Sequence, residues 1–202
     1  MVEYFVRGGP FMWPILICLV LGIALSIERF ISLNRASVNT RKFLAQVIAA
    51  LDKGGASSAV EVCQTTHGPV ASIFHAGLIR AGRGLEHVEK AITNAGTIEM
   101  AFLERGLIWL STFITVAPML GFTGTVSGMV GAFDEIQKAN DISPSIVAGG
   151  ISEALLTTLF GLIVAIILQF CHNYFIAKID RIVIDMEESS AELVDHLVER
   201  GK

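Results

Sequence analysis

The chain has 202 residues, of which 52% are hydrophobic and only 17% are charged, and its formal net charge is −4. A typical soluble domain has about 25% charged and about 45–50% apolar residues, so this composition argues against a soluble protein and favours a membrane protein. The small negative charge offers no basic surface to nucleic acid, and we expect no nucleic-acid partner.

Charged residues are nearly absent from three long stretches of the sequence. Residues 8–27 and 106–133 contain no Asp, Glu, Lys or Arg, and residues 142–177 contain one charged residue, Glu153. A helix needs about 20 mostly apolar residues to cross the hydrocarbon core of a bilayer. The predicted fold class is therefore an all-α integral membrane protein with three transmembrane helices and long cytoplasmic helical extensions. The predicted spans are residues 11–33, 107–133 and 145–177.

We expect the first span to be a retained anchor and not a signal peptide. A signal peptide has a basic start, a short apolar core and a small-residue cleavage site. Here Glu3 balances Arg7 before the apolar residues, and the apolar run ends in Glu28-Arg29 without an A-x-A pattern.

Basic residues are distributed unevenly around the spans, and their distribution predicts the orientation. Only Arg7 and Lys138, of the 15 Lys and Arg residues, lie in the N-terminal tail or in the loop after the second span. The other thirteen lie in residues 28–106 and 178–202, which predicts a cytoplasmic position for these segments. The resulting divisions are an outer N-terminus at 1–10, a cytoplasmic helical segment at 34–106, an outer loop at 134–144 and a cytoplasmic C-terminal helix at 178–202.

The segment after the first span has the apolar periodicity of several short helices that are separated by glycines and one proline. From Leu85 onward no stop signal precedes the second span at Leu107, so we expect one long helix that enters the membrane. Beyond Ala177 the apolar spacing continues, which predicts an amphipathic extension of the third span. The predicted short helices are 40–53, 57–65 and 69–81, with breaks at Gly54-Gly55, His67-Gly68-Pro69 and Gly82-Arg83-Gly84.

Small residues line one face of the second span and one face of the third. They let helix backbones approach closely, and this packing holds helices together in lipid, so the simplest interpretation is a helix contact. Threonines on the same faces often bond their own backbone. Pro118 is expected to bend the second span. The predicted packing positions are Gly121, Gly124, Gly128, Gly150, Ala154 and Gly161.

Glu153 differs from its neighbours, because an ionisable group inside the bilayer costs roughly 2.5–3.5 kcal/mol and usually faces a bundle interior or a wet cavity. It lies twelve residues after Asp141, or about 18 Å along a helix, which predicts a position near the membrane centre. Thr125, nine residues before Asp134, is expected at a similar depth. Apolar surroundings favour a neutral carboxyl, which makes proton binding and release feasible. The alternative is a protonated Glu153 with only a structural hydrogen bond.

Two segments resemble the signatures of the ExbB/TolQ/MotA proton-channel family. Residues 117–129 (APMLGFTGTVSGM) are similar to its second-span motif, and residues 150–158 (GISEALLTT), with Gly161-Leu162, are similar to its third-span motif. The predicted topology resembles that of the family over nearly the whole chain. Three spans favour ExbB or TolQ over MotA.

The resemblance also implies an assembly and a function. It implies a homopentamer in the bacterial inner membrane, with a periplasmic N-terminus and a cytoplasmic C-terminus. The pentamer surrounds an ExbD/TolR-like single-span partner that carries a membrane Asp, and a TonB-like protein is a further partner. Protons are the coupling ion and no other cofactor is implied. The work is energised transport through the outer membrane or, in the TolQ-type role, envelope integrity. The residues implied for the proton path are Glu153, Thr125 and Thr158, with Thr157 beside them on the same face.

Two other functions were weighed against a proton-driven motor. A non-conducting scaffold that holds a partner helix uses the same glycine faces and needs no titration. An intramembrane hydrolase is suggested by Ser127 and His172, but these residues are predicted near opposite ends of their spans, which prevents nucleophile activation, so we expect no enzyme. The widely separated Cys18, Cys63 and Cys171 predict neither a metal site nor a disulfide.

Overall fold

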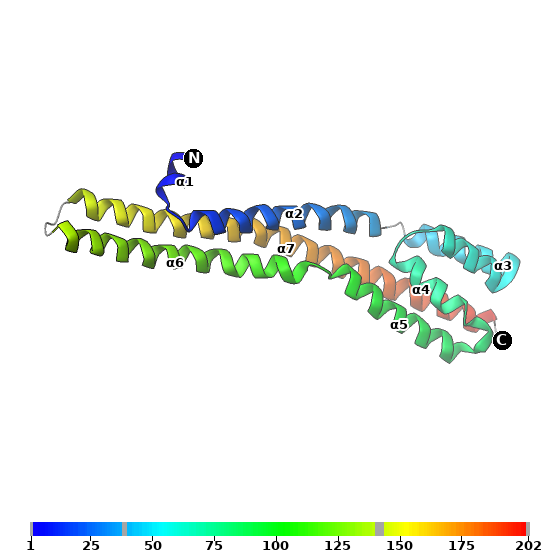
Figure 1. Cartoon of the computed structure of the whole chain (residues 1–202). Helices are drawn as coiled ribbons and strands as arrows, with labels where there is room; N and C mark the ends of the chain where they lie inside the picture. Colours follow the sequence, from blue (N-terminus) through cyan, green and yellow to red (C-terminus); the bar gives the residue numbers. More distant parts are fainter. Residues whose placement is uncertain (1, 38–39, 140–143, 201–202) are drawn as a thin grey trace. The chain divides into compact units, whose positions relative to one another are not determined.

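The computed structural model describes residues 2–37, 40–139 and 144–200 (Figure 1). Within these residues the chain forms helices and no strand. The described residues belong to two compact units: the membrane unit, from 1–28 and 106–174, and the second unit, from 29–105 and 175–202. The elements are α1 (Val2–Arg7), α2 (Met12–Ala36), α3 (Thr40–Thr65), α4 (Pro69–Leu78), the 3₁₀ turn η1 (Ala81–Arg83), α5 (Leu85–Leu103), α6 (Leu107–Ala139) and α7 (Pro144–Arg200).

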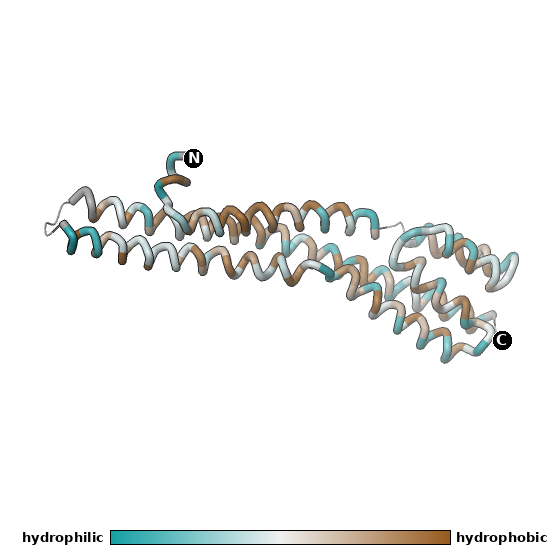
Figure 2. The backbone as a smooth tube through the Cα atoms, viewed as in Figure 1, coloured by the Kyte–Doolittle hydropathy of each residue, from teal (hydrophilic) through white to brown (hydrophobic). Residues whose placement is uncertain are grey.

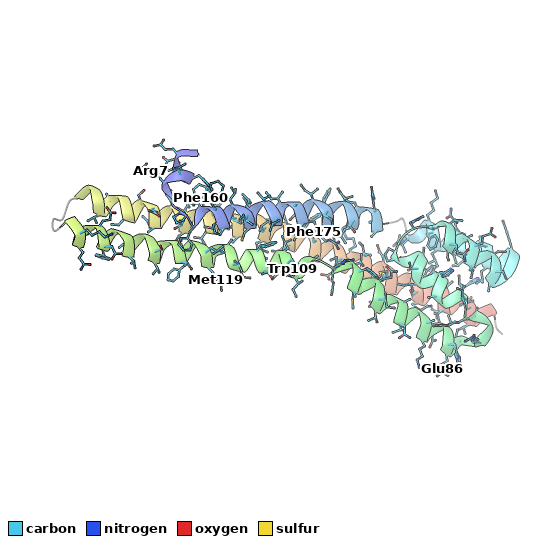
Figure 3. The ribbon with its side chains drawn as sticks, viewed as in Figure 1. Arg7, Glu86, Trp109, Met119, Phe160 and Phe175 are labelled. Atoms are coloured by element: carbon cyan, nitrogen blue, oxygen red, sulfur yellow. The ribbon has the colours of Figure 1, made fainter. Side chains whose placement is uncertain are left out.

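Three helical segments of the described chain are long and apolar enough to cross a membrane, and they include α2, α6 and the first half of α7. Figure 2 shows the apolar residues along α2. Large apolar side chains point outward from the other two helices: Leu155 and Phe170 of α7 are 63% and 74% exposed. On α6, Met119 and Trp109 project from the side opposite α7 (Figure 3). Lipid solvates such side chains, and the predicted all-α membrane fold is confirmed.

The helices of the spans begin close to their predicted starts and continue past their predicted ends. α2 begins at Met12, and α6 begins at Leu107 and continues through its polar last turns to Ala139. α7 is unbroken over 57 residues from Pro144 to Arg200. The predicted extension of the third span as a continuous helix is therefore confirmed.

One expectation is wrong, because α5 and α6 are not a single helix. α5 ends at Leu103 and α6 begins at Leu107, and Gly106 between them has a φ of 86°. Glycine adopts this left-handed conformation at little cost, and the helical hydrogen-bond ladder stops there. Apolar periodicity continues on both sides of the break, so the pattern alone did not indicate the stop.

The second unit has the short helices that its glycines predicted. α3 is kinked at Gly55, which has a φ of 73° and a ψ of −168°, so the break predicted at Gly54-Gly55 is present. α4 follows Gly68 and has Pro69 in its first turn, where a missing N–H is harmless. It ends at Leu78, earlier than predicted, and η1 follows.

Apolar side chains from α3, α4 and the end of α7 form the core of the second unit. Phe43 of α3 stacks on Phe74 of α4 with ring centroids 5.7 Å apart, and Phe74 is fully buried. Leu193 of α7 is also fully buried. Burial raises the pKa of the free Cys63 thiol to about 11, so this thiol stays protonated at neutral pH.

Phe74→Ala is expected to destabilise the second unit by about 3–5 kcal/mol, because it removes a buried ring and leaves a cavity. The temperature at which trypsin begins to cleave the second unit of the full chain in detergent should fall. Ile79→Ala, at a 59% exposed position just after the same helix, is the control and should change stability by less than about 0.5 kcal/mol. Equal cleavage temperatures for the two variants would contradict the core position of Phe74.

Candidate functional site

The backbones of α6 and α7 are in direct contact along an antiparallel face. A Cβ atom added to Gly161 would lie 2.6 Å from the carbonyl oxygen of Ala117, and one added to Gly121 would lie 2.9 Å from that of Thr157. Only glycine fits at such distances, which are shorter than real Cβ contacts. Pro118 lies inside α6 beside this contact, and its ring leaves the helix one hydrogen-bond donor short. Further contacts in the same register join Gly128 to Ala154, Gly150 to Ala132 and Gly124 to Thr157.

Two threonine hydroxyls meet inside this helix contact. Thr125 of α6 and Thr158 of α7 are half-buried, and their hydroxyl groups hydrogen-bond to each other. The Thr125 hydroxyl also lies 3.0 Å from the carbonyl oxygen of Ala154, and the Thr158 hydroxyl lies 3.2 Å from that of Gly121. Each hydroxyl has one hydrogen to donate, and its oxygen can also accept a hydrogen bond. The two hydroxyl oxygens and the two carbonyl oxygens therefore outnumber the two hydrogens. The two hydrogens can therefore redistribute among several bonding patterns.

Thr157 lies next to this pair but does not join it in the described structure. Its side chain is 1% exposed, and its hydroxyl donates to the carbonyl oxygen of Ala154 on its own helix at 2.8 Å. A Cβ atom added to Gly124 would lie 2.7 Å from the Thr157 hydroxyl oxygen. Thr157 thus packs against α6, while its neighbour Thr158 forms the bond between the helices.

The carboxyl group of Glu153 packs against Gly9, in the connection between α1 and α2. A Cβ atom added to Gly9 would overlap the Glu153 Oε1 atom and would lie 2.7 Å from the carboxyl carbon. Among the described residues no hydrogen bond reaches this carboxyl group. The backbone carbonyl of Glu153, by contrast, accepts a hydrogen bond from the Thr157 hydroxyl at 3.3 Å. The structure therefore brings Thr125 and Thr158 together but holds the Glu153 carboxyl apart from them.

The Glu153 carboxyl lies beside the N-terminal end of α2, and its position near the membrane centre stays a prediction. α2 and α7 pack side by side, since a Cβ atom added to Gly22 would contact the Leu168 side chain. Glu153 is level with Gly9, which precedes the first residue of α2, so its carboxyl lies at the N-terminal end of α2 and not at its middle. Asp141, from which the predicted depth is counted, lies outside the described residues. α6 and α7 extend past the start of α2 (Figure 1).

Ser127 and His172, the residues of the hydrolase alternative, do not form a pair. Ser127 is exposed on α6, one residue before Gly128, which faces Ala154. His172 lies eighteen residues further along α7, and its buried Nδ1 has no hydrogen-bond partner within the described residues. A separation of eighteen residues corresponds to about 27 Å along a helix, far beyond a hydrogen bond.

Comparison with known proteins supplies the family. The sequence profile described as the MotA/TolQ/ExbB proton channel family matches residues 65–188, more than half of the chain. The chain belongs to this family. The match covers α4, α5, α6 and most of α7, and so includes the glycine contact and the threonine pair. The resemblance stated on residues 117–129 and 150–158 is confirmed.

Several relatives of this family member are ExbB proteins or ExbB homologues. An ExbB homologue of Methanothermobacter thermautotrophicus is 35% identical over 89% of this chain and 64% of its own length. An ExbB-like protein of Synechocystis is 29% identical over 83% of this chain and 81% of its own length. The biopolymer transport protein ExbB of Xanthomonas campestris is 37% identical over 51% of this chain. The chain thus spans 64% of the length of the Methanothermobacter relative and 44% of the length of the Xanthomonas ExbB.

Sequence reasoning missed one residue of the site, Gly9. The signal that could have indicated it is the pair Gly8-Gly9 before Pro10, immediately before the first span. A glycine pair at that point favours a tight connection with a positive φ, and Gly9 has a φ of 70°. Its contact with Glu153, more than 140 residues away in the sequence, is a tertiary feature that no local pattern predicts.

Proposed function

We propose that this chain is the channel-forming subunit of a motor that couples the proton motive force of the inner membrane to work at the cell envelope, including energised transport through the outer membrane. Membership of a proton channel family supports protons as the coupling ion. The observation that carries the proposal is the hydrogen-bonded pair Thr125–Thr158 inside the α6–α7 contact, with the carboxyl-bearing Glu153 five residues before Thr158 on the same helix.

The proposed path uses groups that can both take up and release a proton. Glu153 is the only carboxylic acid in the three apolar stretches and binds the proton. The hydroxyls of Thr125 and Thr158 donate and accept, so they pass protons or hold the water that does so. Thr157 forms the wall of the path from its packed position against Gly124. An Asp in the span of a partner completes the path.

The proposed assembly is a homopentamer that surrounds single-span partners of the ExbD/TolR type, with a TonB-like protein as a further partner. The names of the relatives, which are biopolymer transport proteins, support the transport role over the TolQ-type role in envelope integrity. Exposed apolar side chains on α6 and α7, such as Phe122 and Leu155, are consistent with neighbouring helices or lipid around this unit.

The proposed localisation is the bacterial inner membrane, with a periplasmic N-terminus and a cytoplasmic C-terminus. The thirteen Lys and Arg residues of 28–106 and 178–202 support a cytoplasmic second unit by the positive-inside rule. In this orientation the N-terminal end of α2, and the Glu153 carboxyl level with it, face the periplasmic side, from which protons enter.

Glu153→Gln is expected to reduce partner-dependent proton uptake into vesicles by about a hundredfold, because the amide cannot bind and release a proton at neutral pH. The assay uses the full chain reconstituted with its single-span partner and a pH-sensitive dye inside the vesicles. Glu135→Gln is the matched control, since Glu135 is an exposed acid near the end of α6. It should conduct like the wild type.

The same assay separates the motor from the non-conducting scaffold. The scaffold is favoured by the glycine contacts at Gly121 and Gly161, which need no titrating group. Wild-type proton flux in Glu153→Gln would show that the carboxyl is not required for conduction. The scaffold is the better description if the wild type and Glu153→Gln both assemble with the partner and neither conducts more than vesicles without the chain.

A further inference from the structure

We propose that Gly9 is a positioning residue for Glu153: its backbone forms a seat that fixes the carboxyl at the N-terminal end of α2, away from the threonine pair. This inference deepens the proposed function and depends on it for its biological meaning. The contact itself stands on the geometry of Gly9 and Glu153 alone.

The seat exists only because residue 9 is a glycine. Gly9 has a φ of 70°, in the left-handed region that disfavours residues with a Cβ atom. A Cβ atom at this position would also overlap the Glu153 Oε1 atom. Any other residue therefore strains the backbone and displaces the carboxyl at the same time.

The backbone of Gly9 is held in place from both sides. The N–H of Gly8 donates to the carbonyl oxygen of Tyr4 at 3.1 Å, and the N–H of Met12 donates to that of Gly9 at 3.2 Å. The rings of Phe5 in α1 and Trp13 in α2 meet edge to face with centroids 5.3 Å apart. This ring contact helps to fix the turn from α1 to α2.

The surroundings of the seat contain little charge that could orient the carboxyl instead. The nearest element, α1, carries Glu3 and Arg7, and both are exposed. Residues 8–27 and 106–133 carry no charged side chain, and Glu153 is alone among residues 142–177. Shape, more than charge or hydrogen bonding, thus fixes the position of the carboxyl.

The seat is tested by the reaction of Glu153 with dicyclohexylcarbodiimide, an apolar reagent that modifies protonated carboxyls. The full chain in phosphatidylcholine vesicles is labelled between pH 5 and pH 9, and the modified peptide is quantified by mass spectrometry. Gly9→Ala should raise the labelling rate about fivefold, because the displaced carboxyl is more accessible to the reagent. A fivefold change corresponds to about 1 kcal/mol of seat stability. Gly149→Ala is the control, since a Cβ atom there meets nothing within 4 Å. It should label like the wild type.

A second pair of variants tests the contact independently of backbone strain. Glu153→Asp shortens the side chain, so it leaves room for a Cβ atom at residue 9. Adding Gly9→Ala to Glu153→Asp should change labelling by less than about twofold, whereas the same change beside Glu153 gives the larger effect. Equal labelling of the wild type and Gly9→Ala at every pH, including equal absence of labelling, would overturn the seat, and so would equal effects in the two backgrounds.

The labelling needs neither a partner nor a proton gradient, so its outcome is separate from that of the flux assay. A changed labelling profile for Gly9→Ala together with normal flux in Glu153→Gln would retain the seat and reject the role of Glu153 in the proton path. An unchanged profile together with lost flux would retain the function and reject the seat.

Discussion

Gly161→Leu should abolish the folded membrane unit. The Cβ position of Gly161 lies 2.6 Å from the carbonyl oxygen of Ala117 and 3.3 Å from the Cα atom of Gly121. These are backbone atoms in the middle of a long helix, and they cannot move aside as a flexible side chain does. The overpacking is expected to cost about 3 kcal/mol or more and to separate Thr125 from Thr158. The yield of monodisperse protein in detergent and its thermal aggregation temperature should both fall sharply.

Gly131→Leu is the matched control for this substitution. Gly131 lies on α6, the helix against which Gly161 packs. A Cβ atom at Gly131 meets nothing within 4 Å, and the residue is exposed. The same added side chain should therefore leave yield and aggregation temperature close to those of the wild type. The experiment uses the chain without a partner, so a stable Gly161→Leu protein would show that α6 and α7 do not pack as described.

Removal of either hydroxyl of the threonine pair should strongly reduce proton uptake. Thr158→Val and Thr125→Val keep the shape of the side chain but remove the group that donates and accepts. Each variant is expected to reduce proton uptake by about tenfold to a hundredfold in vesicles with the partner. The double variant should be little worse than either single one, because two groups that act as a unit are not additive.

Two further variants distinguish a proton path from a packing role. Thr158→Ser keeps a hydroxyl and should retain most of the flux. Thr123→Val is the control, since Thr123 is exposed on α6 and its hydroxyl donates to the Met119 carbonyl at 2.8 Å. Wild-type flux in the Thr125→Val and Thr158→Val double variant would remove the pair from the path, whatever the stability of the protein.

The spans and their glycine faces were predictable because both depend on local patterns. The length of an apolar run sets a span, and a period of 3.6 residues assigns Gly121 and Gly161 to inner faces. The stop at Gly106 was not visible, since a single glycine inside a periodic apolar pattern is common and only its φ of 86° makes it a break.

The details of the site depended on how helices are placed beside one another. Thr157 and Thr158 are adjacent and both lie within the arc of a helical wheel, but only the register of α6 against α7 decides which hydroxyl reaches Thr125. The level of Glu153 depended on the offset between α2 and α7, which counting residues along one helix does not give. The contact between Gly9 and Glu153 depends on the same offset.

The unbroken course of α7 has a mechanical consequence. An α-helix resists twisting because every turn is tied to the next by hydrogen bonds, so α7 is stiff against torsion along its own length from Thr158 to Leu193. Between α5 and α6 the positive φ of Gly106 interrupts the helical hydrogen-bond ladder, so this segment lacks the continuous bonding of α7. An uninterrupted helix and a glycine break thus give two parts of this chain different resistance to twisting.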